Sequence, residues 1–218
     1  MSTMHYQVMI NGISRSFPGE HRLLAEATVD GDVVLLLGTR AGQLLPSLAR
    51  REMRRAILVE LGTECLGVHT GERWALEGSN IVGFARFRLG DAEPSDLVEL
   101  VVQPASAPAA LEAAKALFEG AGLKTAVCRD FPGRILDRLL RPFFNATLNR
   151  LDQGLASADD MDLTLRLGLG YPEGTLALLE RTGLAAHAEI SQALYAALGD
   201  PGFVPARRAQ VAKARAHR

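Results

Sequence analysis

The sequence has few cysteines and no long apolar run. Cys65 and Cys128 are the only cysteines in 218 residues and stand in unrelated contexts, which predicts neither a disulfide framework nor a cysteine metal site. No apolar run reaches the roughly 20 residues that cross a bilayer, and the first residues do not combine a basic stretch with an apolar one. We therefore expect a cytoplasmic protein with no membrane partner and no bound metal.

The chain also lacks an excess of charge of either sign. Its 24 Lys and Arg residues against 25 Asp and Glu give a formal net charge of -1, so nothing in the overall charge predicts nucleic acid as a partner. Hydrophobic residues make up 48% of the chain, and the length suits one large or two small domains. Small molecules and protein partners are the classes of ligand left open.

The first part of the chain alternates strand patterns with helix patterns. Six short runs rich in aliphatic residues predict strands, at residues 5–10, 32–37, 57–61, 80–84, 96–102 and 124–128. The run 32–37 is apolar at nearly every position, which is typical of a strand buried on both faces of a parallel sheet. Helices are predicted after this strand, with Leu44, Leu45, Leu48 and Met53 buried and the arginines at 50, 51, 54 and 55 in solvent, and over 108–120.

From Gly133 onward the patterns predict only helices. Leucines and phenylalanines at spacings of three and four predict a long amphipathic helix over 136–155, with a polar side formed by Arg134, Arg138, Arg141, Asn145, Asn149 and Asp152. Ser157 followed by Asp160 resembles a capping box and predicts a second helix from Ala158. Further helices are expected at 176–182 and 185–198, and the basic tail is interpreted as a solvated helix, with anion binding as the alternative.

Several residues carry a functional and a structural interpretation. Gly38, Arg40 and Gly42 follow a strand and open a helix, which suits an anion at a helix N-terminus, although an ordinary βα turn explains both glycines. His69 lies between glycines and is either a surface-loop histidine or a substitute catalytic base. Three further features are interpreted as structural: His187 as a helix residue, residues 168–174 as a turn between helices, and Trp74 and Tyr171 as core or interface residues.

The order of motifs in the second half resembles one enzyme family. The segments Asp130-Phe131-Pro132-Gly133, Ile135-Leu136-Asp137-Arg138-Leu139-Leu140, Gly154-Leu155-Ala156-Ser157 and Gly168-Leu169-Gly170-Tyr171-Pro172 are similar to the 3-hydroxyacyl-CoA dehydrogenase family. The resemblance runs from about residue 131 to 198, and more faintly upstream through residues 98–101. It implies an α/β plus all-α fold: a truncated Rossmann-like parallel-sheet domain at 1–130, then an all-helical dimerisation domain at 131–218. It also implies NAD as the cofactor, an acyl-CoA ligand and a homodimer formed through the helical domain.

The same resemblance assigns the catalytic positions residue by residue. The family's base is a histidine in a Gly-x-His-Phe-Phe motif, held by a glutamate; here the segment reads Gly83-Phe84-Ala85-Arg86-Phe87. Ala85 therefore stands where the base is expected, while Glu99 matches the orienting glutamate. Asp137 replaces a family asparagine, and Thr63 matches a family serine by a loose alignment. An arginine at position 86 cannot take over as base because its guanidinium stays protonated.

A dinucleotide-binding fingerprint is missing from the sequence. No GxGxxG occurs anywhere, and the alignment leaves room for about half of a normal NAD domain before residue 131. These departures favour a degenerate relative that acts as a binding or partner subunit. Two alternatives stay open: an active NAD-dependent oxidoreductase with a rebuilt site, and different chemistry with Glu99 or Asp137 as a carboxylate base.

Overall fold

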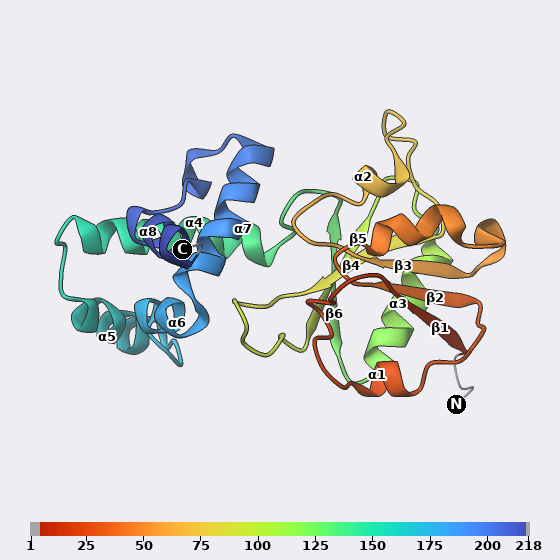
Figure 1. Cartoon of the computed structure of the whole chain (residues 1–218), viewed down its shortest axis with the longest axis horizontal. Coiled ribbons are helices and arrows are strands. Elements are labelled where there is room, and N and C mark those ends of the chain that lie inside the picture. The colour runs from red at the N-terminus through yellow and green to blue at the C-terminus, as the bar shows by residue number, and fades with distance from the viewer. Residues whose placement is uncertain (1–4, 217–218) are drawn as a thin grey trace. The chain divides into compact units, whose positions relative to one another are not determined.

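The computed structural model of the chain describes residues 5–216. The chain folds into two compact units. The first unit comprises Met1–Arg88 and Pro94–Ile135, and the second comprises Leu89–Glu93 and Leu136–Arg218. The short segment Leu89–Glu93, which lies in the chain between two strands of the first unit, thus belongs to the second unit. Figure 1 shows strands in the first unit and helices in the second.

The first unit contains one six-stranded sheet. Its strands lie side by side in the order in which they occur in the chain: β1 (Tyr6–Ile10), β2 (Val33–Leu37), β3 (Ala56–Glu60), β4 (Ile81–Arg86), β5 (Leu97–Val102) and β6 (Lys124–Arg129). Strands β1 to β4 are parallel, β5 runs antiparallel to β4, and β6 is parallel to β5. All six predicted strands form, with ends that move by one or two residues.

Two cores cover the two faces of this sheet. Val33, Leu35 and Leu37 of β2 point toward α3 (Pro108–Gly120), while Val34 and Leu36 point to the other face, so every residue of β2 is fully buried as predicted. The α3 face is filled by small and aromatic side chains, among them Ala113, Ala114 and Phe118. The sheet is therefore a three-layer α/β structure rather than half of a sandwich (Figure 1).

The segment between β2 and β3 departs from the prediction. Instead of one α-helix it forms two short 3₁₀ helices, η1 (Ala41–Ser47) and η2 (Arg51–Met53). Pro46 lies inside η1 and Arg50 adopts the left-handed conformation at φ 51°, and both features prevent a continuous α-helix. Leu45 is buried as expected, but Met53 is 73% exposed. The short helices α1 (Arg22–Ala25) and α2 (Gly67–Thr70) complete the unit.

The second unit is helical over most of its length. It contains α4 (Leu136–Asp152), α5 (Ala158–Leu169), α6 (Thr175–Thr182), α7 (Leu184–Leu198), η3 (Pro201–Phe203) and α8 (Arg207–Ala216). The predicted cap of α5 forms, because Oγ of Ser157 accepts the N–H of Asp160 at 3.1 Å. Asp162 of α5 accepts the N–H groups of Leu176 and Ala177 at 2.8 and 2.9 Å and so caps α6 in turn.

The polar side of α4 does not face solvent throughout. Arg141 and Asn145 are 2% and 3% exposed, although the prediction placed both on the polar side, opposite the buried face. Conversely, Leu139 and Leu155, predicted on the buried face, are 65% and 68% exposed. Trp74, expected in a core or an interface, is 99% exposed and so is not a core residue.

Candidate functional site

Ala85 and Glu99 occupy directly opposed positions on β4 and β5. They form one pair of the antiparallel register, and both are buried, at 4% and 2% exposure. Side chains at opposed positions lie on the same face of a sheet with Cβ atoms about 5 Å apart. The position that the family resemblance assigns to the base therefore lies beside the glutamate that would orient it.

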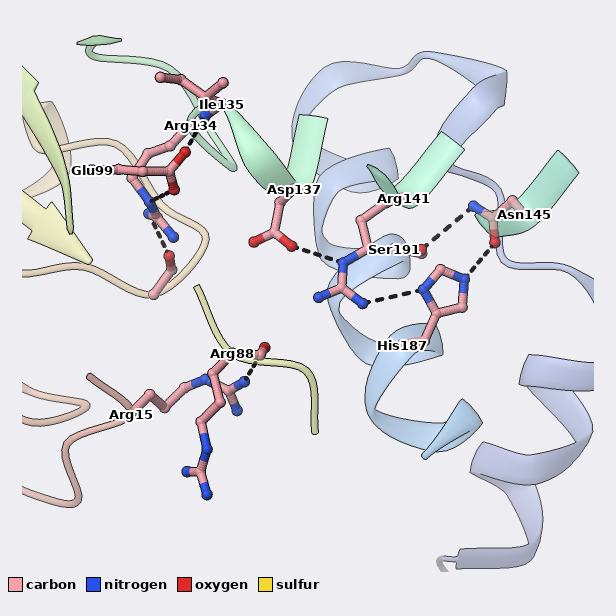
Figure 2. Close-up of polar contacts among 11 residues, drawn as sticks. Arg15, Arg88, Glu99, Arg134, Ile135, Asp137, Arg141, Asn145, His187 and Ser191 are labelled. Carbon is pink, nitrogen blue, oxygen red and sulfur yellow. Dashed lines mark hydrogen bonds and ion pairs between the residues drawn. The ribbon is translucent and has the colours of Figure 1, made fainter. Parts of the chain in front are cut away.

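The carboxylate of Glu99 is engaged by the segment that leads out of the sheet. Its Oε1 accepts the N–H of Ile135 at 2.9 Å, and its Oε2 lies 3.4 Å from Nε of Arg134 (Figure 2). Both side chains of the Glu99–Arg134 pair are more than nine-tenths buried. The charge of Glu99 is thus compensated by an arginine, where the family pattern expects an imidazole.

Residues 130–135, here named the connector, also contact the loop that contains Thr63. The carbonyl of Thr63 accepts the N–H of Gly133 at 3.0 Å, and Nη1 of Arg134 donates to the carbonyl of Gly62 at 2.7 Å. The connector adopts left-handed backbone at Gly133 and Arg134, with φ of 75° and 52°. Thr63 is therefore brought near Glu99 through its backbone, while its side chain is half-buried.

The connector begins at Asp130, which caps the short helix α2. Its carboxylate accepts the N–H groups of Leu66 and Gly67 at 2.6 and 2.8 Å. The same carboxylate receives a longer hydrogen bond from Gln103. The loop after β3, the connector and the residue that follows β5 thus form one hydrogen-bonded assembly.

The turn at Gly38 to Gly42 has the N–H groups of Gly38, Thr39 and Arg40 in use. The N–H of Gly38 donates to Oε2 of Glu60 at 2.6 Å. The N–H groups of Thr39 and Arg40 donate to the carbonyls of Ile13 and Asn11 at 3.1 and 3.0 Å. The side chain of Arg40, the charged member of the predicted anion-binding set, is exposed.

Glu60 places a buried carboxylate at this turn. It is 6% exposed, and its Oε1 accepts the hydroxyl of Ser14 at 3.0 Å and the N–H of Ser16 at 2.7 Å. Dinucleotide folds place a phosphate at the carboxyl end of the first strands, on backbone N–H groups of this kind. Here the anion at that edge is a side chain of the protein itself.

A second carboxylate at the same edge holds a histidine. Nε2 of His69 lies 3.4 Å from Oε1 of Glu64, and a Cβ added to Gly42 would fall within 2.5 Å of the imidazole ring. His69 belongs to α2 and is half-buried, so the prediction of a surface-loop histidine was wrong. Burial favours a raised pKa for Glu64, but the hydrogen bonds from His69 and from backbone N–H groups outweigh it and lower the pKa. Glu64 and Glu60 both line a small cavity of about 90 Å³.

Asp137 lies in the second unit and is part of a buried polar network. Its Oδ1 accepts from Nε of Arg141 at 2.7 Å, one turn further along α4 (Figure 2). Nη1 of Arg141 lies 3.2 Å from Nδ1 of His187, whose Nε2 lies 2.9 Å from Oδ1 of Asn145. Asn145 continues the network to the carbonyl of Gly202 at 3.1 Å. The network therefore joins α4, α7 and η3.

The partners of His187 define its tautomer. A guanidinium can only donate, so Nδ1 accepts from Arg141 and the ring proton lies on Nε2, where it donates to Asn145. Burial, reinforced by the positive charge of Arg141, lowers the pKa of His187 to about 3. His187 is neutral at physiological pH and acts as a structural residue, as predicted.

Sequence patterns missed three residues that organise these sites: Glu60, Arg134 and Arg141. Each is a charged residue buried through a partner distant in the sequence or through an unusual backbone conformation.

Burial raises the pKa of Cys65 and of Cys128 to about 11, and both thiols are free. Within residues 5–216, no cluster of three or more His, Cys, Asp or Glu side chains is arranged to hold a metal ion. None of the described helices has the length and apolar content required to span a membrane.

Comparison with known proteins identifies the second unit. The family profile for the 3-hydroxyacyl-CoA dehydrogenase C-terminal domain matches residues 133–217. Residues 133–217 of the chain thus carry the C-terminal domain of the 3-hydroxyacyl-CoA dehydrogenase family. This confirms the resemblance that the motifs between Asp130 and Pro172 indicated.

Relatives of this family are similar over part of their length. A 3-hydroxybutyryl-CoA dehydrogenase of Bradyrhizobium diazoefficiens is 34% identical over 110 residues, which cover 50% of this chain and 38% of that protein. The mitochondrial hydroxyacyl-coenzyme A dehydrogenase of Homo sapiens is 34% identical over 88 residues, 40% of this chain and 28% of the enzyme. The aligned segment thus spans well under half of these two relatives.

Solved structures of the family share the fold. The crystal structure of an (S)-3-hydroxybutyryl-CoA dehydrogenase from Ralstonia eutropha superposes with a TM-score of 0.69 at 22% identity, covering 85% of this chain and 66% of that one. A Rossmann-like sheet domain followed by the family's helical domain was the predicted architecture, and it is confirmed.

Proposed function

We propose that this member of the 3-hydroxyacyl-CoA dehydrogenase family acts as a binding or partner subunit and does not carry out NAD-dependent oxidation of a 3-hydroxyacyl-CoA. The observation that carries the proposal is the pairing of Glu99 with Arg134 opposite Ala85. Oxidation of a 3-hydroxyl requires a base that takes the hydroxyl proton while hydride leaves for the nicotinamide. An alanine cannot take a proton, and a carboxylate paired with a buried arginine has no imidazole to orient.

The edge of the sheet also fits a dinucleotide poorly. In dinucleotide folds the cofactor lies in the crevice where the strand order reverses, and its pyrophosphate rests on free N–H groups. The described parallel strands β1 to β4 follow one another without such a reversal. The carboxylate of Glu60 occupies the N–H groups of Gly38 and Ser16, and a phosphate placed there would meet a like charge. The residues at this edge therefore do not fit the pyrophosphate of NAD.

An acyl-CoA is the small-molecule ligand that the family membership suggests. The names of the relatives give hydroxyacyl-CoA compounds as their substrates. Binding of an acyl-CoA without turnover would be consistent with loss of the base and of the nucleotide position. Isothermal titration with butyryl-CoA tests this part of the proposal, and a heat signal that saturates supports it. A titration without heat leaves a purely protein-binding role and contradicts the acyl-CoA part.

The helical domain is proposed to form a homodimer. Helix α5 has no buried residue, and Leu163, Leu167 and Leu169 are 49%, 77% and 64% exposed. Beside it lies a cavity of about 420 Å³ in the helical unit, lined mainly by apolar side chains: Phe143, Ala146, Leu155, Met161 and Leu165. An amphipathic helix left uncovered in this way is typical of an interface between subunits.

Light scattering tests the dimer. Twice the chain mass of 23.4 kDa is expected for the wild type, and Leu167→Glu should shift the equilibrium toward monomer because it places a charge on the apolar face. Gln192→Glu adds the same charge at an exposed position of α7 and serves as the matched control. A wild type that stays monomeric over a wide concentration range contradicts the proposal.

The alternative hypothesis of an active oxidoreductase is tested by assaying the protein for NADH-dependent reduction of acetoacetyl-CoA. No turnover above background is expected. Turnover would replace the partner role with the second candidate function, an active oxidoreductase with a rebuilt site. One observation favours that candidate: the Glu64–His69 pair is a carboxylate–histidine pair at the carboxyl end of β3, beside a cavity. In that case His69→Gln would abolish the activity.

A further inference from the structure

Four arginines lie within six residues ahead of β3, and the guanidinium groups of three of them have no hydrogen-bond or ion-pair partner among the described residues. Arg50, Arg51 and Arg55 are exposed, and none of their guanidinium groups forms a hydrogen bond or an ion pair with another residue of the described chain. The nearby acid Asp30 already binds Arg54 at 2.7 Å. The turn also contains one exposed acid, Glu52, so the four arginines leave a local excess of positive charge in a chain with a net charge of -1.

The backbone that carries these arginines is held in place. Nδ2 of Asn80 donates to the carbonyls of Arg51 and Arg54 at 2.9 and 2.6 Å, and Arg54 also donates to the carbonyl of Gly31. Arg50 adopts the left-handed conformation at φ 51°, which a non-glycine residue keeps only when its surroundings fix it. A fixed backbone lowers the entropy lost when the side chains engage a partner.

An apolar side chain stands among the charges. Met53 lies between Arg51 and Arg55 in sequence and is 73% exposed. Arginine and methionine are both enriched in protein–protein interfaces, and methionine adapts its shape to an apolar partner. A surface that recognises phosphate alone gains nothing from an exposed thioether. The combination therefore favours a polypeptide over a phosphate compound.

We propose that Arg50, Arg51, Met53 and Arg55, here named the arginine turn, form a docking surface for an acidic segment of a partner protein that also presents an apolar side chain to Met53. The inference rests on the proposed role as a partner subunit. The experiment on the arginine turn measures peptide binding, whereas the proposed function is tested by NADH-dependent turnover. The docking surface and the proposed function can therefore fail independently. Attraction between exposed charges also predicts an affinity that falls as ionic strength rises.

The test is fluorescence anisotropy with a labelled glutamate-rich peptide that carries one central leucine, and with the same peptide carrying serine instead. The full-length protein should bind the leucine peptide more tightly. Removing two charges in Arg51→Gln/Arg55→Gln should weaken binding of both peptides by about tenfold, the sum of two exposed ion pairs. Met53→Ser should weaken binding of the leucine peptide alone. Arg22→Gln/Arg73→Gln removes two exposed arginines elsewhere in the same unit and should leave the affinity unchanged.

Two results would overturn the proposal. The first is equal affinity in the wild type, in Arg51→Gln/Arg55→Gln and in the control pair, including no detectable binding by any of them. The second is displacement of both peptides by tripolyphosphate together with no effect of Met53→Ser. That result would make the turn a phosphate-binding surface instead of a docking surface for a polypeptide.

Discussion

Ala85 faces Glu99 across the antiparallel pair β4 and β5, and the carboxylate of Glu99 is bound by Arg134 and by the N–H of Ile135. The sequence resemblance predicts that the family's base and its orienting glutamate occupy this pair of positions. The buried carboxylate of Glu99 contacts the connector through Arg134, which adopts a left-handed backbone conformation, and through the N–H of Ile135. The proposed loss of chemistry and the local stability of the fold thus depend on the same carboxylate.

Ala85→His should not create a dehydrogenase. The new imidazole would lie beside Glu99, but the carboxylate is committed to Arg134, and the larger side chain must enter a buried position, at a cost of about 1–3 kcal/mol. We expect no turnover of acetoacetyl-CoA with NADH and a lower free energy of unfolding in urea. Activity in this variant would mean that the cofactor position survives and that only the base was lost.

Glu99→Gln should destabilise the first unit strongly. The amide can still accept the N–H of Ile135, but it leaves the guanidinium of Arg134 buried without a counter-charge, which costs about 3–5 kcal/mol. Urea unfolding measures the difference. Glu20→Gln makes the same chemical change at an exposed site and should alter stability by less than about 0.5 kcal/mol. A similar small effect at both sites would show that Arg134 does not need Glu99.

His187 should make stability depend on pH below neutrality. Burial lowers its folded pKa to about 3 from an ordinary value near 6.5, so the unfolded chain binds the proton more readily between these values. The stabilisation is complete above about pH 6.5 and decreases as the pH falls toward 3, by up to about 1.4 kcal/mol per pH unit. His187→Gln should remove this part of the slope. In the wild type, NMR should find Nδ1 of His187 unprotonated at pH 5, and an imidazolium there would contradict the account.

Gly42→Ala should disturb the Glu64–His69 pair. The added methyl group would meet the imidazole ring at 2.1 Å, so the ring must move, and overpacking of this kind costs about 1–3 kcal/mol. The loss should be smaller in a His69→Ala background, which a double-mutant cycle measures. Gly120→Ala, at a helical position with no atom near the new Cβ, should be neutral or stabilising. Additive effects of the substitutions at 42 and 69 would show that the two residues do not compete for space.

The strands and most helices were predictable because their patterns are local. The continuous apolar run of β2 predicts burial on both faces, and Ser157 with Asp160 predicts the start of α5. The segment between β2 and β3 was not predictable in the same way. Its leucines are spaced as in an α-helix, but Pro46 and the left-handed Arg50 divide it into 3₁₀ turns.

The candidate sites depend on partners far apart in the sequence. Arg141 and Asn145 have the helical spacing of solvent-facing residues, yet they are buried against His187, which is more than 40 residues away. Glu60 ends an apolar strand and becomes the acceptor for Ser14 and Gly38, which the sequence does not connect to it. The family resemblance predicted which positions Ala85 and Glu99 match. The structure revealed that Arg134 pairs with Glu99.

Titration of the protein with NADH, followed by fluorescence, tests the central claim most directly. We predict no saturable binding at micromolar NADH, because Glu60 occupies the N–H groups of Gly38 and Ser16 and the sequence carries no GxGxxG turn. Saturable binding at micromolar NADH would contradict the account.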